Sequence, residues 1–223
     1  MQRDVPAELL IVGGGAAGCV LARRLADGGM SVILLEAGPD LGNRIGPDLL
    51  DGWRNPKGSD WTTDWGFASE PDAEGNSSPL RRGRVLGGTS WLTRFAVRGH
   101  PADFNAWAAR GNRGWSFDEV LPAFRRLEAD ADFADQPWHG NAGPMSINRY
   151  GAYRRSAIHD ATVEALEGLG FPGVADHNAP GAVGVGPMPM STRDGRRITT
   201  VQAYLQAGPV PPSLASHSLV HSR

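Results

Sequence analysis

The stretch Leu9–Glu36, LLIVGGGAAGCVLARRLADGGMSVILLE, decides the fold class. It opens on four apolar strand formers, passes through a run of glycines and ends in a second apolar run, Val32–Leu35, followed by an acid. Between the two runs, apolar and small residues recur at helical spacing. A strand, a glycine-rich turn, a helix and a second buried strand form a β-α-β unit with parallel strands. The sequence therefore predicts an α/β fold.

The glycines of this stretch follow the pattern G-x-G-x-x-G at Gly13, Gly15 and Gly18. In that pattern the first glycine permits the tight turn, the second lets the backbone approach a pyrophosphate, and the third lets the helix pack closely on the strand. The amides and the positive dipole end of the helix then face the phosphates. Glu36 follows Gly18 by 18 residues, where its carboxylate can accept hydrogen bonds from a ribose diol and repel a 2′-phosphate. We therefore expect a Rossmann-like dinucleotide site that disfavours NADP.

Composition excludes several other classes of protein. The chain has 22 basic and 24 acidic residues, a net charge of −2 and no long run of one sign, which argues against a nucleic-acid or membrane-surface partner. The first apolar run is too short to span a membrane, and the polar start MQRDVPAE shows no signal peptide. The single cysteine, Cys19, fits a reducing compartment and a packing role. We expect a cytoplasmic protein with no membrane span.

Further motifs follow the β-α-β unit in a fixed order. The longest are Arg82–Ser90, RGRVLGGTS, and Arg98–Phe104, RGHPADF. The shorter ones are DWGF at 64–67, GWSF at 114–117, WHG at 138–140 and RDGRR at 193–197. Together they resemble the glucose-methanol-choline (GMC) family of FAD-dependent oxidoreductases, from about residue 8 to the end of the chain.

The resemblance implies a fold, a cofactor and a reaction. The expected fold is a Rossmann-like FAD-binding domain, incomplete in this chain, with an inserted α+β region on the substrate side. The expected boundaries are 1–98 for the FAD-binding part with its flavin loop, 99–195 for the substrate-side segment and 196–223 for the return to the FAD-binding domain. In this family an alcohol is oxidised to an aldehyde or ketone by hydride transfer to flavin N5. The family's catalytic histidine belongs to a later segment, so no catalytic residue is named, and the chain alone is expected to be inactive.

The expected cofactor is non-covalent FAD, because Leu92 stands beside the position where some relatives attach the flavin through a histidine. Thr93 stands near the place of a family asparagine, which puts one flavin contact in doubt. The histidines show no metal-ligand spacing, so no metal site is expected, and His100 and His139 are expected to make structural hydrogen bonds. The candidate cofactor-binding residues are Gly13, Gly14, Gly15, Ala16, Ala17, Gly18, Glu36, Ala37, Arg84, Val85, Gly87, Gly88, Thr89, Ser90, Thr93 and Val220.

Two helices and a strand are expected in the rest of the chain. Ser116–Glu119 reads as a capping box before a helix whose apolar face is Phe117, Val120, Leu121, Phe124 and Leu127. A second helix is expected at about 154–169, with its apolar positions Ile158, Ala161, Ala165, Leu166 and Leu169 facing inward. The stretch 213–221 reads as a strand that returns to the nucleotide-binding domain.

Two alternatives to the leading function stay open. The first is an NAD-dependent dehydrogenase that uses the same glycine fingerprint, and the loop after Arg84 counts against it. The second is a truncated, non-catalytic remnant with residual FAD affinity. The substrate is expected to be a small-molecule alcohol, while the particular alcohol, the electron acceptor and any completing partner chain stay open.

Overall fold

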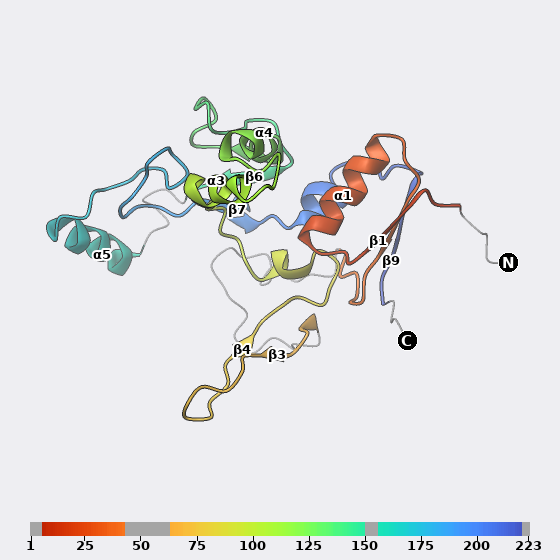
Figure 1. Cartoon of the computed structure of the whole chain (residues 1–223), viewed down its shortest axis with the longest axis horizontal. Helices are drawn as coiled ribbons and strands as arrows, with labels where there is room; N and C mark the ends of the chain where they lie inside the picture. The colour runs from red at the N-terminus through yellow and green to blue at the C-terminus, as the bar shows by residue number, and fades with distance from the viewer. Residues whose placement is uncertain (1–5, 43–62, 150–155, 220–223) are drawn as a thin grey trace. The chain divides into compact units, whose positions relative to one another are not determined.

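The computed structural model describes residues 6–42, 63–149 and 156–219 (Figure 1). Val220, one of the candidate cofactor residues, lies outside these ranges. The chain divides into two compact units. Unit 1 consists of Met1–Arg94 and Gly195–Arg223, and unit 2 is Phe95–Asp194.

Unit 1 contains a parallel sheet of three strands in the order β1-β2-β9. The strands are β1 (Leu9–Val12), β2 (Val32–Leu35) and β9 (Leu214–His217), and α1 (Ala16–Asp27) connects β1 to β2 (Figure 1). In the parallel register Val32 lies between Leu9 and Leu214. The predicted β-α-β unit and the returning strand are therefore both present, and the prediction of an α/β fold is confirmed.

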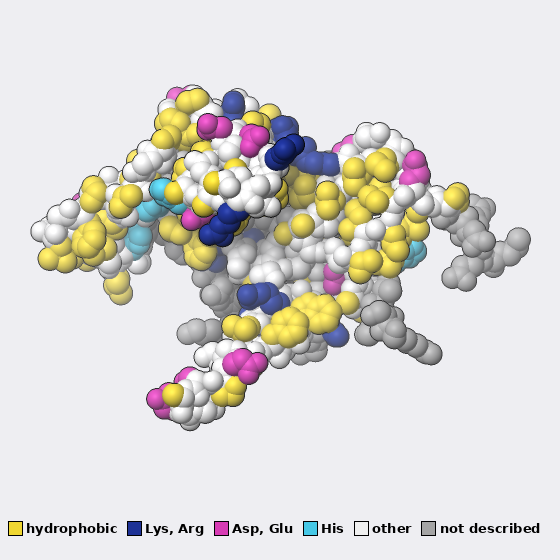
Figure 2. Space-filling view, viewed as in Figure 1, with side chains coloured by type: hydrophobic (Ala, Val, Ile, Leu, Met, Phe, Trp, Pro, Cys, Tyr) yellow, Lys and Arg dark blue, Asp and Glu magenta, His cyan; other side chains and the backbone are white. Residues whose placement is uncertain are grey.

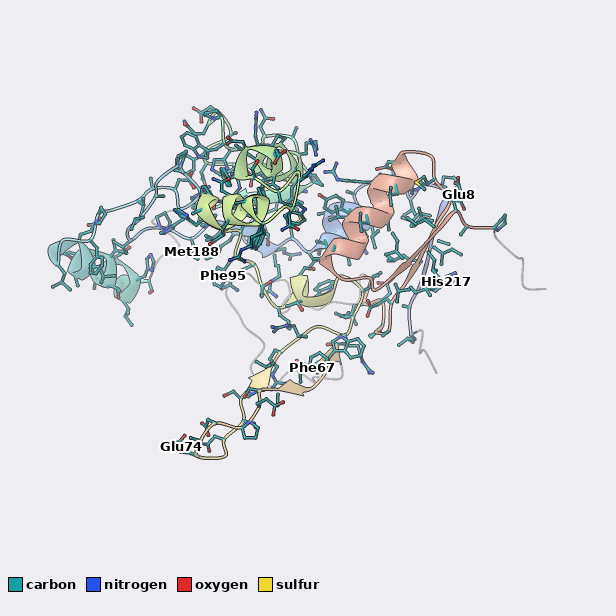
Figure 3. The ribbon with its side chains drawn as sticks, in the orientation of Figure 1. Glu8, Phe67, Glu74, Phe95, Met188 and His217 are labelled. Atoms are coloured by element: carbon teal, nitrogen blue, oxygen red, sulfur yellow. The ribbon has the colours of Figure 1, made fainter. Side chains whose placement is uncertain are left out.

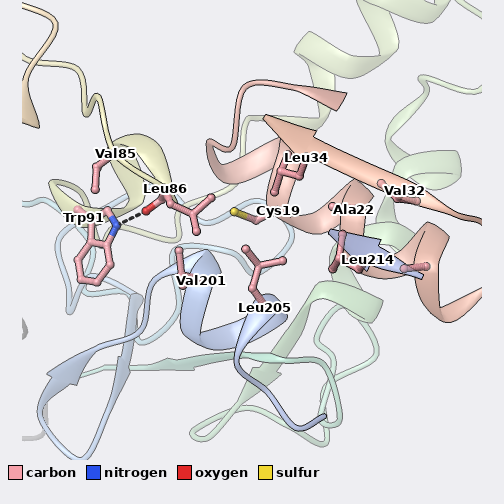
Figure 4. Close-up of a cluster of buried hydrophobic side chains, with 11 residues drawn as sticks. Cys19, Ala22, Val32, Leu34, Val85, Leu86, Trp91, Val201, Leu205 and Leu214 are labelled. Atoms are coloured by element: carbon pink, nitrogen blue, oxygen red, sulfur yellow. Dashed lines mark hydrogen bonds between the residues drawn. The ribbon is translucent and has the colours of Figure 1, made fainter. Parts of the chain in front are cut away.

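The core of unit 1 lies between α1, the sheet and a short helical turn, η4 (Val201–Leu205) (Figure 4). Cys19 and Ala22 of α1 are fully buried, because small side chains let the helix approach its neighbours closely. Leu34 of β2 is also fully buried, whereas Leu10 and Val12 of β1 are 57% and 80% exposed. The buried members are Cys19, Ala22, Ala26, Val32, Leu34, Val85, Leu86, Trp91, Val201, Leu205 and Leu214. Figure 2 shows the exposed hydrophobic side chains over the α1 and β1 region.

The remaining elements of unit 1 are short. Strands β3 (Phe67–Ala68) and β4 (Pro79–Leu80) pair antiparallel, with Glu74 in the loop between them (Figure 3). The 3-10 turn η2 (Gly88–Trp91) follows, and β8 (Arg196–Arg197) begins the second segment of the unit.

Unit 2 combines helices with a small mixed sheet. Its elements are α3 (Pro101–Ala109), α4 (Phe117–Leu127), β5 (Glu128–Asp130), β6 (Met145–Asn148), α5 (Ala157–Gly168) and β7 (Met190–Arg193). Strand β5 runs parallel to β6, and β6 runs antiparallel to β7. The ring of Phe104 packs α3 against α4 through Phe117 and Phe124, at centroid distances of 5.9 and 5.8 Å. Phe95, at the start of the unit, lies near Met188 in Figure 3 and bridges to Met190.

The expectation for α4 is confirmed. The Glu119 carboxylate accepts the backbone N–H of Ser116 at 3.1 Å, and the Ser116 side chain accepts the backbone N–H of Glu119, as a capping box requires. The five apolar positions of the helix are half-buried, while Asp118, Arg125 and Arg126 are exposed.

The inward face expected for α5 is wrong for Ile158, Ala161, Ala165 and Leu169, which are exposed, and right for Leu166, which is half-buried. Ile158 is 80% exposed and Leu169 is 75% exposed, and the half-buried positions of the helix are His159, Val163 and Leu166. The Ser156 hydroxyl caps this helix by accepting the His159 N–H at 3.2 Å. Helical periodicity predicted the element correctly, but periodicity alone does not determine which face is covered.

No helix in the described part of the chain has the length and apolar character needed to cross a membrane.

Candidate functional site

The first part of the candidate site is the turn between β1 and α1. Gly13 has a φ of +100°, which side-chain-bearing residues rarely adopt, and its N–H donates to the Leu35 carbonyl at 2.8 Å. A methyl group on Gly18 would overlap the Gly13 carbonyl oxygen, so this helix packs as closely as a glycine allows. A methyl group on Gly15 would meet no atom within 4 Å. Gly13 and Gly18 therefore serve the turn itself, while the space beside Gly15 is open.

The second part is the loop that contains Gly87 and Gly88. Both residues have positive φ, +93° and +53°. The Gly87 N–H donates to the Gly14 carbonyl at 2.6 Å, and a Cβ on Gly88 would lie 2.9 Å from the Gly15 Cα. The two glycine loops are thus packed backbone against backbone, at a distance that no side chain at Gly88 would permit.

The indole of Trp91 anchors the second loop. Its Nε1–H donates to the Leu86 carbonyl at 2.6 Å, inside the apolar core (Figure 4). Val85 is 2% exposed and lies in the same core. Since residues on both sides of the bend are buried, the loop is anchored in the core of unit 1.

Glu36 closes the site at the end of β2. Its carboxylate is buried and accepts the N–H groups of Gly14 and Gly38, both at 2.8 Å. A methyl group on Gly38 would overlap the Arg84 carbonyl oxygen. The carboxylate therefore joins the first glycine loop to the turn after β2, and that turn is pressed onto the second loop. Sequence reasoning missed Gly38, although a glycine two residues after the strand-ending acid was a usable signal.

The polar side chains of the second loop are engaged within unit 1. Thr89 Oγ1 accepts the Gly83 N–H at 3.2 Å, and Ser90 Oγ donates to the Gly87 carbonyl at 2.6 Å. Ser90 Oγ also lies 3.2 Å from Thr200 Oγ1, a contact between distant segments that sequence reasoning did not find. Thr93 is exposed, and its hydroxyl donates to the Thr89 carbonyl at 3.3 Å.

The other candidate residues lie near the two glycine loops and Glu36. Ala16 and Ala17 are exposed in the first turn of α1, and Ala37 is half-buried beside Glu36. Arg84 is half-buried, with its guanidinium 6.0 Å from the centre of the Trp65 ring. The structure thus brings together the candidates from Gly13 to Ser90.

The N-terminus of α1 differs electrostatically from those of the three helices α3, α4 and α5 of unit 2. The first turn of α1 holds no acidic residue, whereas α3, α4 and α5 carry Asp103, Asp118 with Glu119, and Asp160 there. A helix leaves its first N–H groups without intrahelical partners and carries partial positive charge at that end. The start of α1 is therefore suited to a negatively charged ligand.

Cys19 has a structural role. Its Sγ donates to the Gly14 carbonyl at 3.2 Å, and burial raises the pKa of the thiol to about 11. The side chain is a thiol at neutral pH, and it helps to hold the first glycine loop on α1.

Unit 2 contains a buried cluster of charged side chains that sequence reasoning did not find. Glu128, Asp130, His139, Arg149 and Asp176 are all less than 10% exposed. Atoms of Glu128, Asp130 and His139 lie within 4.8 Å of one another, a spacing that could suit a cation. Arg149 already binds both oxygens of Asp130, at 2.9 and 2.8 Å, so a cation there would face a guanidinium group. The arrangement is that of an ion-pair network.

Comparison with known proteins agrees with this geometry. The family model for GMC oxidoreductase matches residues 7–209. The chain is 39% identical over 206 residues to the oxygen-dependent choline dehydrogenase of Brucella ovis, which covers 90% of this chain and 36% of that protein. It is 36% identical over 219 residues to a GMC-type oxidoreductase of Rhodococcus erythropolis, covering 96% of this chain and 43% of the other.

Solved structures give the same result. The crystal structure of pyridoxine 4-oxidase from Mesorbium loti superposes with a TM-score of 0.83 at 34% identity, over 96% of this chain and 42% of that one. The chain thus spans less than half the length of these relatives. On the evidence of the family match, the relatives and the shared fold, this chain belongs to the GMC oxidoreductase family.

Proposed function

We propose that unit 1 is the FAD-binding part of an oxidoreductase that acts on the CH–OH group of a small alcohol. The observation that carries this proposal is the contact of the two glycine loops, in which Gly88 lies against Gly15 without a side chain between them. Two backbones at this distance, beside an open space at Gly15, form a cradle that an extended dinucleotide could occupy.

The residues present fit such a cofactor. The amides at the start of α1, from Ala16 to Gly18, would bind the pyrophosphate. The Glu36 carboxylate uses one hydrogen bond on each oxygen for the backbone, and each oxygen has a further lone pair for a ribose hydroxyl. The loop from Arg84 to Ser90 would lie along the flavin. Binding would be non-covalent, because Leu92 has no group that could bond to the ring.

The residues of this chain are proposed to bind and orient the cofactor. FAD, when bound, supplies the hydride acceptor for oxidation of an alcohol carbon. The buried Trp91 and Val85 fix the second loop before binding, so that less ordering is needed when the cofactor enters. Unit 2 corresponds to the segment proposed for the substrate side. We assign the proton-accepting base to no residue of the chain.

The names of the relatives support an alcohol as the substrate class. One is a choline dehydrogenase and another a pyridoxine 4-oxidase, and both named compounds carry a hydroxyl group on carbon. Because one relative is named a dehydrogenase and the other an oxidase, the electron acceptor stays open, and we propose only the shared CH–OH chemistry. We also propose a cytoplasmic location, on the strength of the single buried cysteine.

An absorption spectrum tests the proposal. The purified chain is mixed with FAD, passed through gel filtration and scanned in the visible range. We expect two flavin bands that co-elute with folded protein, and release of the flavin when the protein is denatured. A colourless protein that instead binds NADH, detected by quenching of tryptophan fluorescence, would overturn the assignment to FAD.

A further inference from the structure

The buried cluster in unit 2 is organised around the imidazole of His139. The His139 side chain is 0% exposed, and both of its ring nitrogens face carboxylates. Nδ1 lies 2.7 Å from Glu128 Oε1 and 3.3 Å from Asp130 Oδ2, while Nε2 lies 2.9 Å from Asp176 Oδ2. A neutral imidazole carries one N–H, so it could donate to only one side of this arrangement.

The charge balance of the cluster calls for a proton on His139. Its three buried carboxylates, Glu128, Asp130 and Asp176, face two guanidinium groups, those of Arg98 and Arg149. With a neutral imidazole the buried cluster would carry one uncompensated negative charge, and with an imidazolium it is neutral.

Other charged groups around the ring do not change this count. Arg125 of α4 lies outside the network, where its Nε donates to the His139 backbone carbonyl at 3.2 Å. Asp132 accepts the Arg149 backbone N–H at 2.5 Å and lies 3.6 Å from Arg149 Nη1, but its side chain is 37% exposed, so water screens its charge.

We propose that His139 is held as an imidazolium inside unit 2, and that its Nε2 proton fastens the cavity-lining segment 176–182 to the rest of the unit. Asp176 begins this segment and also accepts hydrogen bonds from the indole of Trp138 at 3.0 Å and from the Asn178 N–H at 2.9 Å. Residues 177–182 line a cavity of about 240 Å³, together with Val97–Pro101, Phe117 and Trp138.

The geometry also determines which proton is lost first. Nδ1 faces two carboxylates and Nε2 faces one, so the Nδ1 proton is the more strongly held. Loss of the Nε2 proton leaves a nitrogen lone pair facing the Asp176 oxygen. The contact then becomes repulsive, and the segment that begins at Asp176 is loosened.

The pH dependence follows from two shifts of opposite sign. Burial alone would lower the pKa of His139, but its hydrogen bonds to Glu128 and Asp176 and the nearby negative charges outweigh it and raise the pKa. Burial would raise the pKa of Asp176, but hydrogen bonds from His139 and its neighbours lower it to about 2. The His139 contribution is complete below about pH 6.5 and is lost as the pH rises through its folded pKa. The Asp176 contribution is present above about pH 4 and is lost as the pH falls toward 2.

The first test measures the protonation of His139 in the unchanged chain, and a variant is used only to assign its signal. Two-bond ¹H–¹⁵N spectra of the full chain, labelled at histidine, are recorded from pH 5 to 9.5, and His139→Gln identifies the signal. We expect both nitrogens of His139 to be protonated at pH 7, with a midpoint above that pH and with Nε2 losing its proton first. A neutral ring at pH 7, or loss of the Nδ1 proton first, would overturn the proposal.

The second test compares thermal unfolding of variants across the same pH range. The Tm of the unchanged chain should fall between pH 6 and 9, and the Tm of the His139→Gln variant should fall much less over that interval. His159→Gln, in α5, is the matched control and should keep the slope of the unchanged chain. If His139→Gln does not fold, Asp176→Asn serves instead: it removes one carboxylate, so the midpoint of His139 should fall. Equal slopes in all chains, or an unmoved midpoint in Asp176→Asn, would contradict the proposal.

Discussion

Unit 1 and unit 2 bury different kinds of side chain. The described hydrophobic core of unit 1 consists mostly of small and aliphatic residues, with Trp91 as its aromatic member. Among the described residues of unit 2, the buried hydrophobic side chains are Phe104, Ile147 and Pro189, and five titratable side chains are buried as well. One unit is held by apolar packing and close glycine contacts, and the other by a closed ion-pair network. The two should therefore respond differently to substitution, pH and salt.

The largest effect is expected when one charge is removed from the network. In Arg149→Ala, Asp130 and Asp176 lose the guanidinium that binds both of them. Removing one partner of a buried ion pair costs about 3–5 kcal/mol, because the other charge stays buried. Urea unfolding measures the change, with the exposed Arg113→Ala as a control that should stay within about 0.5 kcal/mol. A loss near that of the control would show that the cluster is not what holds unit 2.

In unit 1 the corresponding change adds a single methyl group. Gly18→Ala places a Cβ on the Gly13 carbonyl oxygen, and overpacking of this kind costs about 1–3 kcal/mol. Gly168→Ala makes the same substitution in α5, where the added methyl meets nothing within 4 Å. We expect Gly18→Ala to lower the free energy of unfolding and Gly168→Ala to raise it, since alanine favours the helix where space permits. Equal stability of the two in urea unfolding would contradict the close contact of α1 with the glycine turn.

A smaller effect is expected from the anchor of the second glycine loop. Trp91→Phe removes the hydrogen bond to the Leu86 carbonyl and leaves a buried acceptor without a partner, at a cost of about 1–2 kcal/mol. Trp115→Phe is the matched control, because Trp115 is 51% exposed. Comparing thermal unfolding of both variants separates the lost hydrogen bond from the general effect of replacing an indole. If the control loses as much, the anchoring role is refuted.

The smallest effect is expected on the exposed face of α5. Ile158→Ala should change the unfolding free energy by no more than about 0.5 kcal/mol, because the side chain is 80% exposed. A buried isoleucine would lose about 2–5 kcal/mol on the same change. Chemical denaturation of this variant thus decides between the face expected from periodicity and the face that the structure shows.

The same contrast explains what the sequence could predict. The pattern of Leu9–Glu36 predicts β1, α1 and β2 because each element has its own period and its own glycine signal. The capping box at Ser116 predicts the start of α4 for a similar reason. These signals are local, and each predicts its own element without reference to the rest of the chain.

The ion-pair network could not be found in this way. Glu128, His139, Arg149 and Asp176 are separated by 10 to 27 residues in the sequence. Each is of a type that is more often exposed than fully buried. Only the folded chain shows that they share one buried site. The contact between Ser90 and Thr200 was hidden for the same reason, because 110 residues separate the two partners.

The central claim, that the two glycine loops of unit 1 cradle FAD, is tested most directly at Gly15. Its backbone has a φ of −71° and a ψ of −167°, which alanine can adopt, and an added methyl would meet no protein atom within 4 Å. The measurement is the FAD affinity of Gly15→Ala by flavin fluorescence titration, alongside its Tm without FAD and with Gly168→Ala as the control. We expect an unchanged Tm and at least a tenfold weaker affinity, since the methyl would occupy the space proposed for the pyrophosphate. An unchanged affinity at an unchanged Tm would contradict the claim.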